Sequence, residues 1–339
     1  MKKALIFVLA LAVIACIFAF FGVKKQLDTR TLNQAQELVQ IPRGSSLMKI
    51  SEILQQRGIL NSGTPLRIFC KLNECNLKAG WYEIPPNSSV EELLALLSSG
   101  KSAEKKITIP EGRASWEYPA YLRRQFPEID SVKWEGLVHN AEFAKELGVD
   151  AGSLEGYLLP GTYQVPIDAD EAAILKLLVA ANLKLKGEME ALGTEAWKKL
   201  GGWHQVLTLA SVVEEETGKP DERPEIAGVF HNRLNLGMPL GADPTVRFIF
   251  RNLTGPIYKS QLASDSPYNT RKFKGLMPGP ISNPGRAAIE ATLHPAETKN
   301  LYFVAKDDGS GTHFFSPTLS GHNRYKDQAA RNRGEWVFK

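Results

Sequence analysis

Three consecutive glutamates, Glu214 to Glu216, end an apolar segment that begins at Val206. A helix places each residue beside those three and four positions away, so the three carboxylates continue three different stripes. Glu214 continues the apolar stripe of Leu207 and Ala210. A carboxylate at the end of an apolar stripe loses hydration, which raises its pKa toward the range that a general acid needs near neutral pH. Glu214 is therefore the candidate acid.

The other two glutamates have different expected surroundings. Glu215 continues a stripe of Thr208 and Ser211 and has Lys219 four residues later, which predicts a solvated face. Glu216 follows another apolar stripe and could lie near the same rim as the candidate acid, from the other side. Glutamates at a helix end can also simply face water, and the three residues alone leave that alternative open.

Two helices and a set of loops must position these carboxylates. The first predicted helix covers 206–217 and the second 223–236, with Ile226, Val229, Phe230 and Leu234 on one face. Loops rich in Pro, Gly and amide or hydroxyl side chains follow, at 241–245, 268–270, 275–281 and 283–285. Such loops usually connect elements, but they can also line a groove for a sugar chain, which needs donors and acceptors beside flat apolar surfaces.

The N-terminal segment predicts a membrane anchor. Residues 4–23 are uncharged and have two lysines on either side, and their length suffices to cross a hydrocarbon core of about 30 Å. We expect a cytoplasmic tail at 1–3, one transmembrane helix at 4–23 and a linker at 24–37. A weak lipoprotein-type processing site ending at Cys16 is the alternative, but the apolar run continues beyond it, which favours an uncleaved helix.

An internal repeat organises the next part of the chain. Ile41-Pro42 and Ile84-Pro85 are each followed by two serines and an amphipathic pattern at the same spacing. Each copy predicts a short strand, a turn, a serine cap and a helix, and Ser89 with Glu92 fits a capping box. The predicted helices end at Gly58 and Gly100. Two ordinary strand and helix pieces would give the same pattern. A third strand near Ile107 predicts a new unit from about residue 104.

Composition excludes several function classes. The chain has 41 Lys and Arg against 37 Asp and Glu, and these charges are interspersed, so nothing indicates nucleic-acid binding. Its histidines lack metal-ligand spacing, and Gly-rich phosphate loops and a G-x-S-x-G serine are absent. We therefore expect no metal and no cofactor. Cys70 and Cys75 could form a disulfide in an oxidising compartment or could be small buried apolar residues.

Ordered motifs resemble those of the membrane-anchored endolytic murein transglycosylases, the YceG-like family. The matching segments lie at 210–217, 229–234, 243–245, 268–270, 275–279, 283–285, 294–295, 301–304, 312–314 and 322–323. The resemblance implies an α+β fold in which the transmembrane helix precedes a LysM-like α/β module at 38–102. A small connecting α/β subdomain at 103–165 and a catalytic domain at 166–339, with a glutamate-bearing helix, would follow.

The resemblance also implies an activity. Members cleave the bond between N-acetylmuramic acid and N-acetylglucosamine inside peptidoglycan strands, leave 1,6-anhydromuramoyl ends and so terminate nascent strands. Glu214 matches the catalytic glutamate, and Glu216 matches a second glutamate that would orient the sugar or stabilise developing positive charge. Glu215 and Met277 depart from the common pattern. The residues expected to bind substrate are Asn232, Arg233, Asp243, Thr245, Tyr268, Asn269, Thr270 and His313.

The expected partners are peptidoglycan glycan strands and peptidoglycan synthases. The expected location is the cytoplasmic (inner) membrane, with a single span and the catalytic part on its outer, periplasmic side. A non-catalytic, membrane-anchored scaffold that binds peptidoglycan is the alternative function. Glu214 separates the two hypotheses, because a scaffold has no use for a carboxylate that has lost its hydration.

Overall fold

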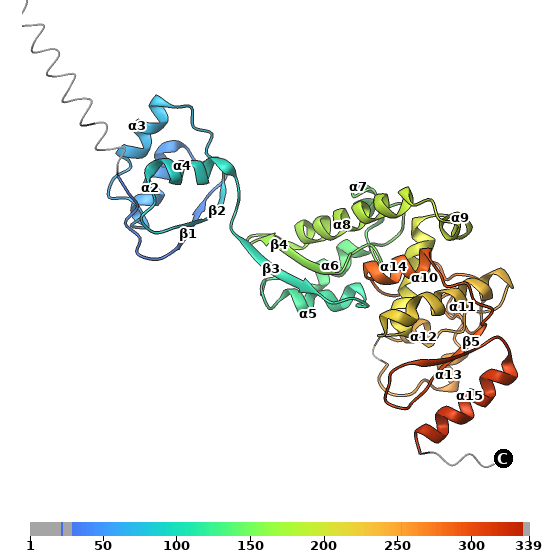
Figure 1. Cartoon of the computed structure of the whole chain (residues 1–339). Helices are drawn as coiled ribbons and strands as arrows, with labels where there is room; N and C mark the ends of the chain where they lie inside the picture. The colour runs from blue at the N-terminus through green and yellow to red at the C-terminus, as the bar shows by residue number, and fades with distance from the viewer. Residues whose placement is uncertain (1–21, 23–28, 252, 335–339) are drawn as a thin grey trace, which may run out of the picture. The chain divides into compact units, whose positions relative to one another are not determined.

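The computed structural model describes residues 22, 29–251 and 253–334, and the chain divides into two compact units (Figure 1). The first unit contains the described residues up to Lys105 together with Gln164–Asp168, and the second contains Lys106–Tyr163 and the described residues from Ala169 onward. Both units combine helices with two-stranded sheets, so the predicted mixed α+β class is confirmed. Residues 106–163 share a unit with the glutamate-bearing helix, whereas the sequence predicts a separate connecting subdomain there.

The first unit packs three helices against a hairpin-like pair of strands. Strand β1 (Glu37–Ile41) pairs antiparallel with β2 (Gly80–Ile84), and Val39 lies opposite Tyr82. The helices are α2 (Leu47–Gln56), α3 (Thr64–Leu72) and α4 (Val90–Ser99). Apolar residues from all five elements form one buried core, which includes Ile41, Leu54, Leu66, Ile84 and Leu93.

The repeat predicted from the sequence is confirmed in this unit. Both strands end at the isoleucine before the proline, and both following helices begin after a serine cap. The Ser46 and Ser89 hydroxyls accept the backbone N–H groups of Lys49 and Glu92, and the Glu92 carboxylate completes the capping box. Helix α3 has no counterpart in the repeat, and the sequence prediction missed it.

The predicted linker 24–37 contacts this unit over its second half. The Thr31 N–H donates to the Ser88 carbonyl at 2.8 Å, and the Leu32 N–H donates to the Ile59 carbonyl at 2.9 Å. These bonds attach the segment that precedes β1 to the start of α4 and the end of α2.

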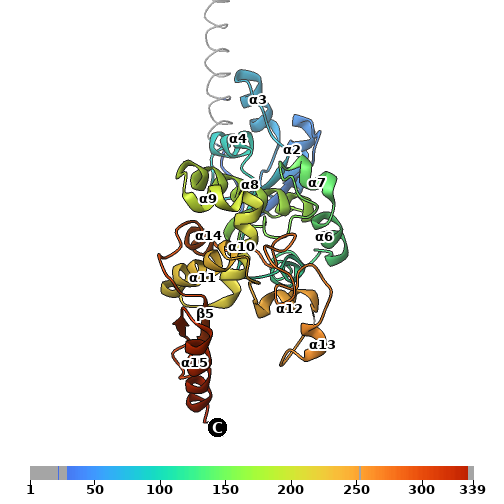
Figure 2. The ribbon, with the colours of Figure 1, turned by 90° about the vertical axis from the view of Figure 1, so that its right-hand side faces the viewer.

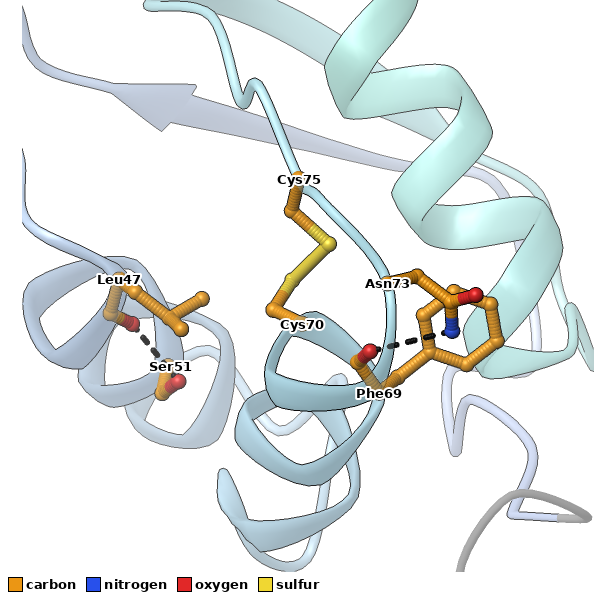
Figure 3. The surroundings of a disulfide bond; sticks show 6 residues. All are labelled: Leu47, Ser51, Phe69, Cys70, Asn73 and Cys75. Carbon is orange, nitrogen blue, oxygen red and sulfur yellow. Dashed lines mark hydrogen bonds between the residues drawn. A yellow bond between two sulfur atoms is a disulfide. The ribbon is translucent and has the colours of Figure 1, made fainter.

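Cys70 and Cys75 form a disulfide that closes the end of α3 onto the following loop (Figure 3). Beside it, the Asn73 amide donates to the Phe69 carbonyl at 3.2 Å, which satisfies a carbonyl in the last turn of the helix. The sequence left open whether these two cysteines pair, and the structure resolves that alternative in favour of the disulfide.

The second unit begins at Lys106, within a strand, and continues with several short helices. Strand β3 (Glu104–Ile109) pairs with β4 (Gly161–Pro166). Between them lie a 3₁₀ turn at Ser115–Glu117, α5 (Tyr118–Leu122), α6 (Ser131–Val138) and α7 (Ala141–Glu146). After β4 come α8 (Glu171–Ala191) and α9 (Glu195–Leu200).

The glutamate-bearing helix is α10 (Trp203–Glu216), and it is followed, after a 3₁₀ turn at Pro220–Glu222, by α11 (Arg223–Asn235). Both helices were predicted from the apolar periodicity to within a few residues of their observed ends. The remaining elements are α12 (Asp243–Ile249), α13 (Lys259–Leu262), α14 (Arg286–Leu293), β5 (Tyr302–Ala305), β6 (His313–Ser316) and α15 (Leu319–Asn332).

Helix α10 lies in the middle of the second unit, in contact with α11 and α14 (Figure 2). Its apolar side chains join a buried cluster with α11 and with the loop that precedes α14, through residues such as Leu209, Val213, Phe230 and Ile281. Strands β5 and β6 pair antiparallel, and α15 packs against both. The C-terminal end of α10, which carries the three glutamates, is thus held by elements distant in sequence.

No helix within the described residues is long and apolar enough to span a membrane. The predicted span at 4–23 lies outside the described residues except for Gly22. The membrane anchor therefore remains a prediction.

Candidate active site

The three glutamates at the end of α10 have different surroundings. Glu214 is buried, with 9% of its surface exposed, and ends the stripe of Leu207 and Ala210, both fully buried. The predicted burial of Glu214 at the end of this stripe is therefore confirmed, and its role as the acid stays a prediction. Glu215 is exposed and Glu216 is partly exposed. They border two different cavities of the second unit.

Both carboxylate oxygens of Glu214 accept a hydrogen bond. The Arg223 Nη2 atom donates to Oε1 at 2.8 Å, and the Gly285 backbone N–H donates to Oε2 at 2.9 Å. Arg223 is the first residue of α11, and Gly285 immediately precedes α14. The side-chain orientation of Glu214 is therefore set by the two helices that pack against α10.

A second carboxylate lies close to this ion pair. The Glu111 Oε2 atom is 3.7 Å from Arg223 Nη2, and the Glu111 side chain is about half exposed. The Arg223 side chain is nearly buried, and its Nε atom has no hydrogen-bond partner in the structure. Arg223 thus bridges a buried and an exposed carboxylate, and its buried Nε–H has no partner among the described residues.

Gly285 allows these groups to approach each other. A Cβ atom at this position would lie 2.1 Å from Glu111 Oε1, so the Glu111 side chain would have to move away from its present position. The same close packing occurs at Gly112, where a Cβ atom would lie 2.9 Å from Glu215 Oε1. Gly112 also has a φ of +71°, which favours glycine. The turn after β3 therefore lies directly against the end of α10.

Opposing effects act on the pKa of Glu214. Burial raises it above the ordinary value, whereas the Gly285 N–H and the Arg223 guanidinium lower it, and the Glu111 carboxylate raises it again. The desolvation effect is the largest, so the net direction is upward. A raised pKa increases the protonated fraction near neutral pH, which is what a general acid requires.

Glu215 borders an open groove of about 720 Å³, which we call the aromatic groove. Loss of hydration raises the pKa of Glu215 to about 7, although its side chain is exposed at the groove, and the Glu214 carboxylate adds to this rise. The other side chains lining the groove include Trp116, Tyr121, Arg124, Arg247, Phe248 and Arg251.

The aromatic groove combines flat rings with cations. The Trp116 and Phe248 ring centroids lie 5.3 Å apart, and the Arg251 guanidinium lies 4.2 Å from the Trp116 centroid. Tyr268 extends the series, with its ring 4.9 Å from that of Phe248. Flat apolar rings beside polar groups suit sugar rings, which present apolar faces and hydroxyl edges.

The prediction of a solvated stripe below Glu215 is wrong. Thr208 and Ser211 are buried. The Ser211 hydroxyl accepts the Ile281 N–H at 3.0 Å and donates to the Thr208 carbonyl at 2.8 Å. No ion pair links Glu215 to Lys219 in the described part of the chain. The Ser211 hydroxyl holds the loop before α14, whereas the Thr208 hydroxyl donates to the His204 carbonyl of the same helix, and only the end of the stripe is exposed.

Glu216 borders a second cavity of about 560 Å³, which we call the Glu216 cavity. Burial raises the pKa of Glu216 to about 8, and the Asp243 carboxylate adds to this rise, whereas Arg233 and Arg271 oppose it. The predicted role of Glu216 in orienting sugar or stabilising charge stays a prediction, because this cavity and the aromatic groove have different lining residues.

Three of the residues expected to bind substrate, Arg233, Asp243 and His313, also line the Glu216 cavity. The Arg233 guanidinium donates to the Leu301 carbonyl at 2.6 Å and to the Leu240 carbonyl at 2.5 Å, so it also anchors two loops. Asp243 forms an ion pair with Arg271 at 2.5 Å. The His313 ring pairs with Glu222 at 2.8 Å.

The remaining expected binding residues lie elsewhere. Tyr268 packs on Phe248, which lines the aromatic groove, and the Asn232 amide donates to the carbonyls of Thr298 and Asn300. The side chains of Thr245, Asn269 and Thr270 are buried and hydrogen bonded within the protein. Direct contact with a substrate would require exposed side chains, so in this structure these three residues position loops instead.

The sequence prediction missed Glu111, Arg223, Gly285 and the aromatic side chains of the groove as site residues. The local signals were the Pro-Glu-Gly turn at 110–112, which indicated a strand end, and the loop 283–285, which indicated a possible groove lining but no contact with Glu214. Residues 111, 214 and 285 meet through tertiary packing, which has no sequence periodicity.

The model of the YceG-like family matches residues 39–328 of this chain. This chain therefore belongs to the YceG-like family. It is 32% identical to an endolytic murein transglycosylase of Bacillus subtilis, over 88% of this chain and 86% of that protein. It is 31% identical to an endolytic murein transglycosylase of Streptococcus pneumoniae, over 90% of this chain and 61% of that protein.

A solved structure agrees with this relationship. The crystal structure of a YceG-like protein from Listeria monocytogenes aligns with a TM-score of 0.59 and 31% sequence identity. The alignment covers 86% of this chain and 99% of that protein. The likeness therefore extends over most of the fold.

Proposed function

We propose that this chain is an endolytic murein transglycosylase that cleaves peptidoglycan glycan strands and uses Glu214 as its acid. One structural observation carries the assignment. Glu214 is a buried carboxylate with raised pKa, fixed by Arg223 and Gly285, next to a groove lined by aromatic rings. The names of the similar proteins from Bacillus subtilis and Streptococcus pneumoniae support the same activity.

The proposed reaction needs one acid that later acts as a base. Protonated Glu214 gives its proton to the glycosidic oxygen as the bond from that oxygen to the anomeric carbon of N-acetylmuramic acid breaks. The 6-hydroxyl of the same sugar then forms a bond to the anomeric carbon and gives its proton to the Glu214 carboxylate. Glu214 ends protonated, and the new end is a 1,6-anhydro sugar. Because the nucleophile is intramolecular, no second carboxylate is needed to activate water.

Arg223 and Glu111 have supporting roles in this proposal. Arg223 holds the Glu214 carboxylate in one orientation and stabilises its ionised form, which arises after the first proton transfer. The exposed Glu111 carboxylate offsets the charge of Arg223, so that Glu214 can still be protonated before the reaction. Arg223 thus lowers the pKa of Glu214, and Glu111 raises it.

Product analysis tests the proposed reaction. The detergent-solubilised full-length protein is incubated with purified glycan strands, and the new ends are identified by mass spectrometry. An intramolecular reaction adds no water, so we expect internal fragments whose muramoyl ends are lighter by one water than reducing ends. Reducing ends alone would identify a hydrolase, and absence of cleavage with retained strand binding would favour a non-catalytic scaffold.

We further propose that the chain is held in the cytoplasmic membrane by residues 4–23, with both compact units outside. The uncharged length of this segment supports the span, and the disulfide supports an oxidising compartment, where such bonds persist. The protein should stay with membranes after a high-salt wash, which removes electrostatic attachment. A lipid-modified mature N-terminus at Cys16 would show lipoprotein processing instead.

The first unit is proposed to be a LysM-like module that binds glycan strands, and peptidoglycan synthases are proposed as partners. The two serine-capped strand and helix repeats support the first proposal. Cross-linking of the membrane-bound protein in cells, followed by mass spectrometry, tests the second. Recovery of synthases at the same level with an unrelated single-span protein would contradict it.

A further inference from the structure

The Glu216 cavity lies entirely within the second unit. Its wall comes from the C-terminal end of α10, from α11, β5 and β6, and from α15. With a volume of about 560 Å³, it has room for a short peptide or a single sugar. Its lining is dominated by charged and polar side chains.

Two polar groups in this cavity lack a partner. The buried Nδ1 atom of His322 has no hydrogen-bond partner among the described residues, and the partly exposed Glu216 forms no hydrogen bond or ion pair with another of them. Buried polar atoms are nearly always hydrogen bonded, so the unpaired His322 nitrogen indicates a ligand in this cavity. Both groups line the same cavity.

The cavity has an excess of positive charge. Arg271 is paired with Asp243, whereas Arg233 and Lys326 form no ion pair within the described chain. Two guanidinium nitrogens of Arg233 donate to backbone carbonyls, which leave its charge uncompensated. Glu216 compensates little of this charge, because its pKa of about 8 keeps it mostly protonated at neutral pH. An anionic ligand would restore the balance.

The aromatic side chains of this cavity disfavour a sugar ring. The Tyr302 ring is covered by Arg233, whose guanidinium carbon lies 5.3 Å from the ring centroid. Phe303 packs edge-on against Phe230 at 5.7 Å. Both rings therefore already have packing partners within the protein. The donors that remain suit a carboxylate, which accepts from cations and from a protonated carboxyl group.

We propose that the Glu216 cavity binds a free carboxylate of the peptide attached to the muramoyl residues of the glycan strand. This inference rests on the proposed function, because only a peptidoglycan strand brings such a peptide beside its sugars. The aromatic groove would then hold the sugars, while the Glu216 cavity would distinguish strands that carry peptides from bare ones. Lys326 and Arg233 would contact the carboxylate, and Glu216 and His322 would complete its hydrogen bonds.

Binding measurements on an inactive protein test this proposal. The full-length Glu214→Gln variant in detergent is titrated with N-acetylmuramoyl-L-alanyl-D-isoglutamine, with its methyl ester and with inorganic phosphate. We expect the free acid to bind and to shift the imidazole NMR signals of His322, and the ester to bind about tenfold more weakly, since a charged hydrogen bond is lost. Equal binding of the ester would overturn the proposal. Phosphate binding as tight as the free acid would show a general anion site and would also overturn it.

Variants of exposed lysines provide the matched control. Lys326→Met, on the surface of α15, should weaken binding of the free acid about threefold to tenfold, and Lys326→Arg should restore it. Lys259→Met, on α13, removes the same charge away from the cavity and should have no effect. Equal affinities of the Lys326→Met and Lys259→Met variants would contradict the proposal. Product analysis of the parent protein is independent of these titrations, so failure of the proposed reaction and failure of carboxylate binding are distinguishable.

Discussion

Arg223 donates a hydrogen bond to the Glu214 carboxylate at 2.8 Å while it lies 3.7 Å from the Glu111 carboxylate. A general acid paired with an arginine is held in one orientation, but the pairing also favours its ionised form. In this site burial and the Glu111 charge act against the arginine, and the pKa of Glu214 is raised on balance. The protonation of Glu214 thus depends mainly on its burial, and the Glu111 carboxylate, which does not contact it, adds to the effect.

Replacement of the acid tests its assignment. Glu214→Gln keeps the size of the side chain but cannot supply a proton, and general acid catalysis contributes roughly 10²–10⁴-fold. We expect a folded protein whose cleavage rate on purified strands falls by about that factor.

Glu215→Gln is the matched control for the acid. Glu215 follows the acid in sequence and borders the aromatic groove, and its pKa is raised to about 7, so it is a second carboxyl group able to carry a proton near neutral pH. We expect its replacement to change the cleavage rate less than about tenfold. Loss of activity in Glu215→Gln with retention in Glu214→Gln would transfer the acid role to Glu215.

The pH profile of cleavage should respond in opposite directions to two substitutions. Activity of an acid falls as the pH rises through its pKa. Glu111→Gln removes a charge that raises the pKa of Glu214, so the alkaline limb should move to lower pH. Arg223→Met removes a charge that lowers it, so the limb should move to higher pH. The two limbs should therefore move apart, and identical limbs in both variants would contradict this charge balance.

Glu216 should make stability depend on pH. Its pKa is about 8 in the folded chain, above the usual value of a glutamate, so its contribution is complete in acid and is lost as the pH rises toward 8. One pKa unit corresponds to about 1.4 kcal/mol. Water in the cavity screens the charge, so we expect a loss of about 1–2 kcal/mol. Urea unfolding from pH 5 to 9 should show this decline in the parent and a flatter curve in Glu216→Gln.

Glu155 should be a major stabilising residue of the second unit. Its buried carboxylate accepts hydrogen bonds from the Ser115 N–H, from the Ser115 hydroxyl and from the Asn283 amide. Glu155→Ala would leave these buried donors unpaired, which costs about 3 kcal/mol or more. Denaturant unfolding measures the loss, and the exposed Glu128→Ala is the control. An equal free energy of unfolding for the two variants would show that these bonds contribute little.

Periodicity predicted the elements of the site better than its contacts. The stripe of Leu207 and Ala210 placed Glu214 correctly, because a helix packed on a core keeps its apolar residues on one side. The same reasoning failed for Ser211, whose hydroxyl accepts a backbone N–H from the loop before α14. Sequence periodicity does not distinguish a buried polar residue that has a tertiary hydrogen-bond partner from an exposed polar residue.

Contacts between loops that are distant in the chain could not be predicted from the sequence. Glu111 and Gly285 are more than a hundred residues apart, and their approach depends on how the turn after β3 packs against the start of α14. Asn283 makes part of that packing, since its amide contacts Glu155 and the Arg113 carbonyl. Such pairings have no local signature, so the site could be predicted only as a helix end followed by polar loops.

The hydrogen bond from the Gly285 N–H to Glu214 also determines when the site is completed during synthesis of the chain. The ribosome makes a chain from its N-terminal end, so the helix that carries Glu214 exists before residue 285 has been joined to it. Until that residue arrives, the carboxylate lacks one of its two donors and the neighbouring loop is missing. A growing chain therefore passes most of its synthesis without a complete catalytic group, and a wall-cutting activity would begin only when the protein is nearly finished.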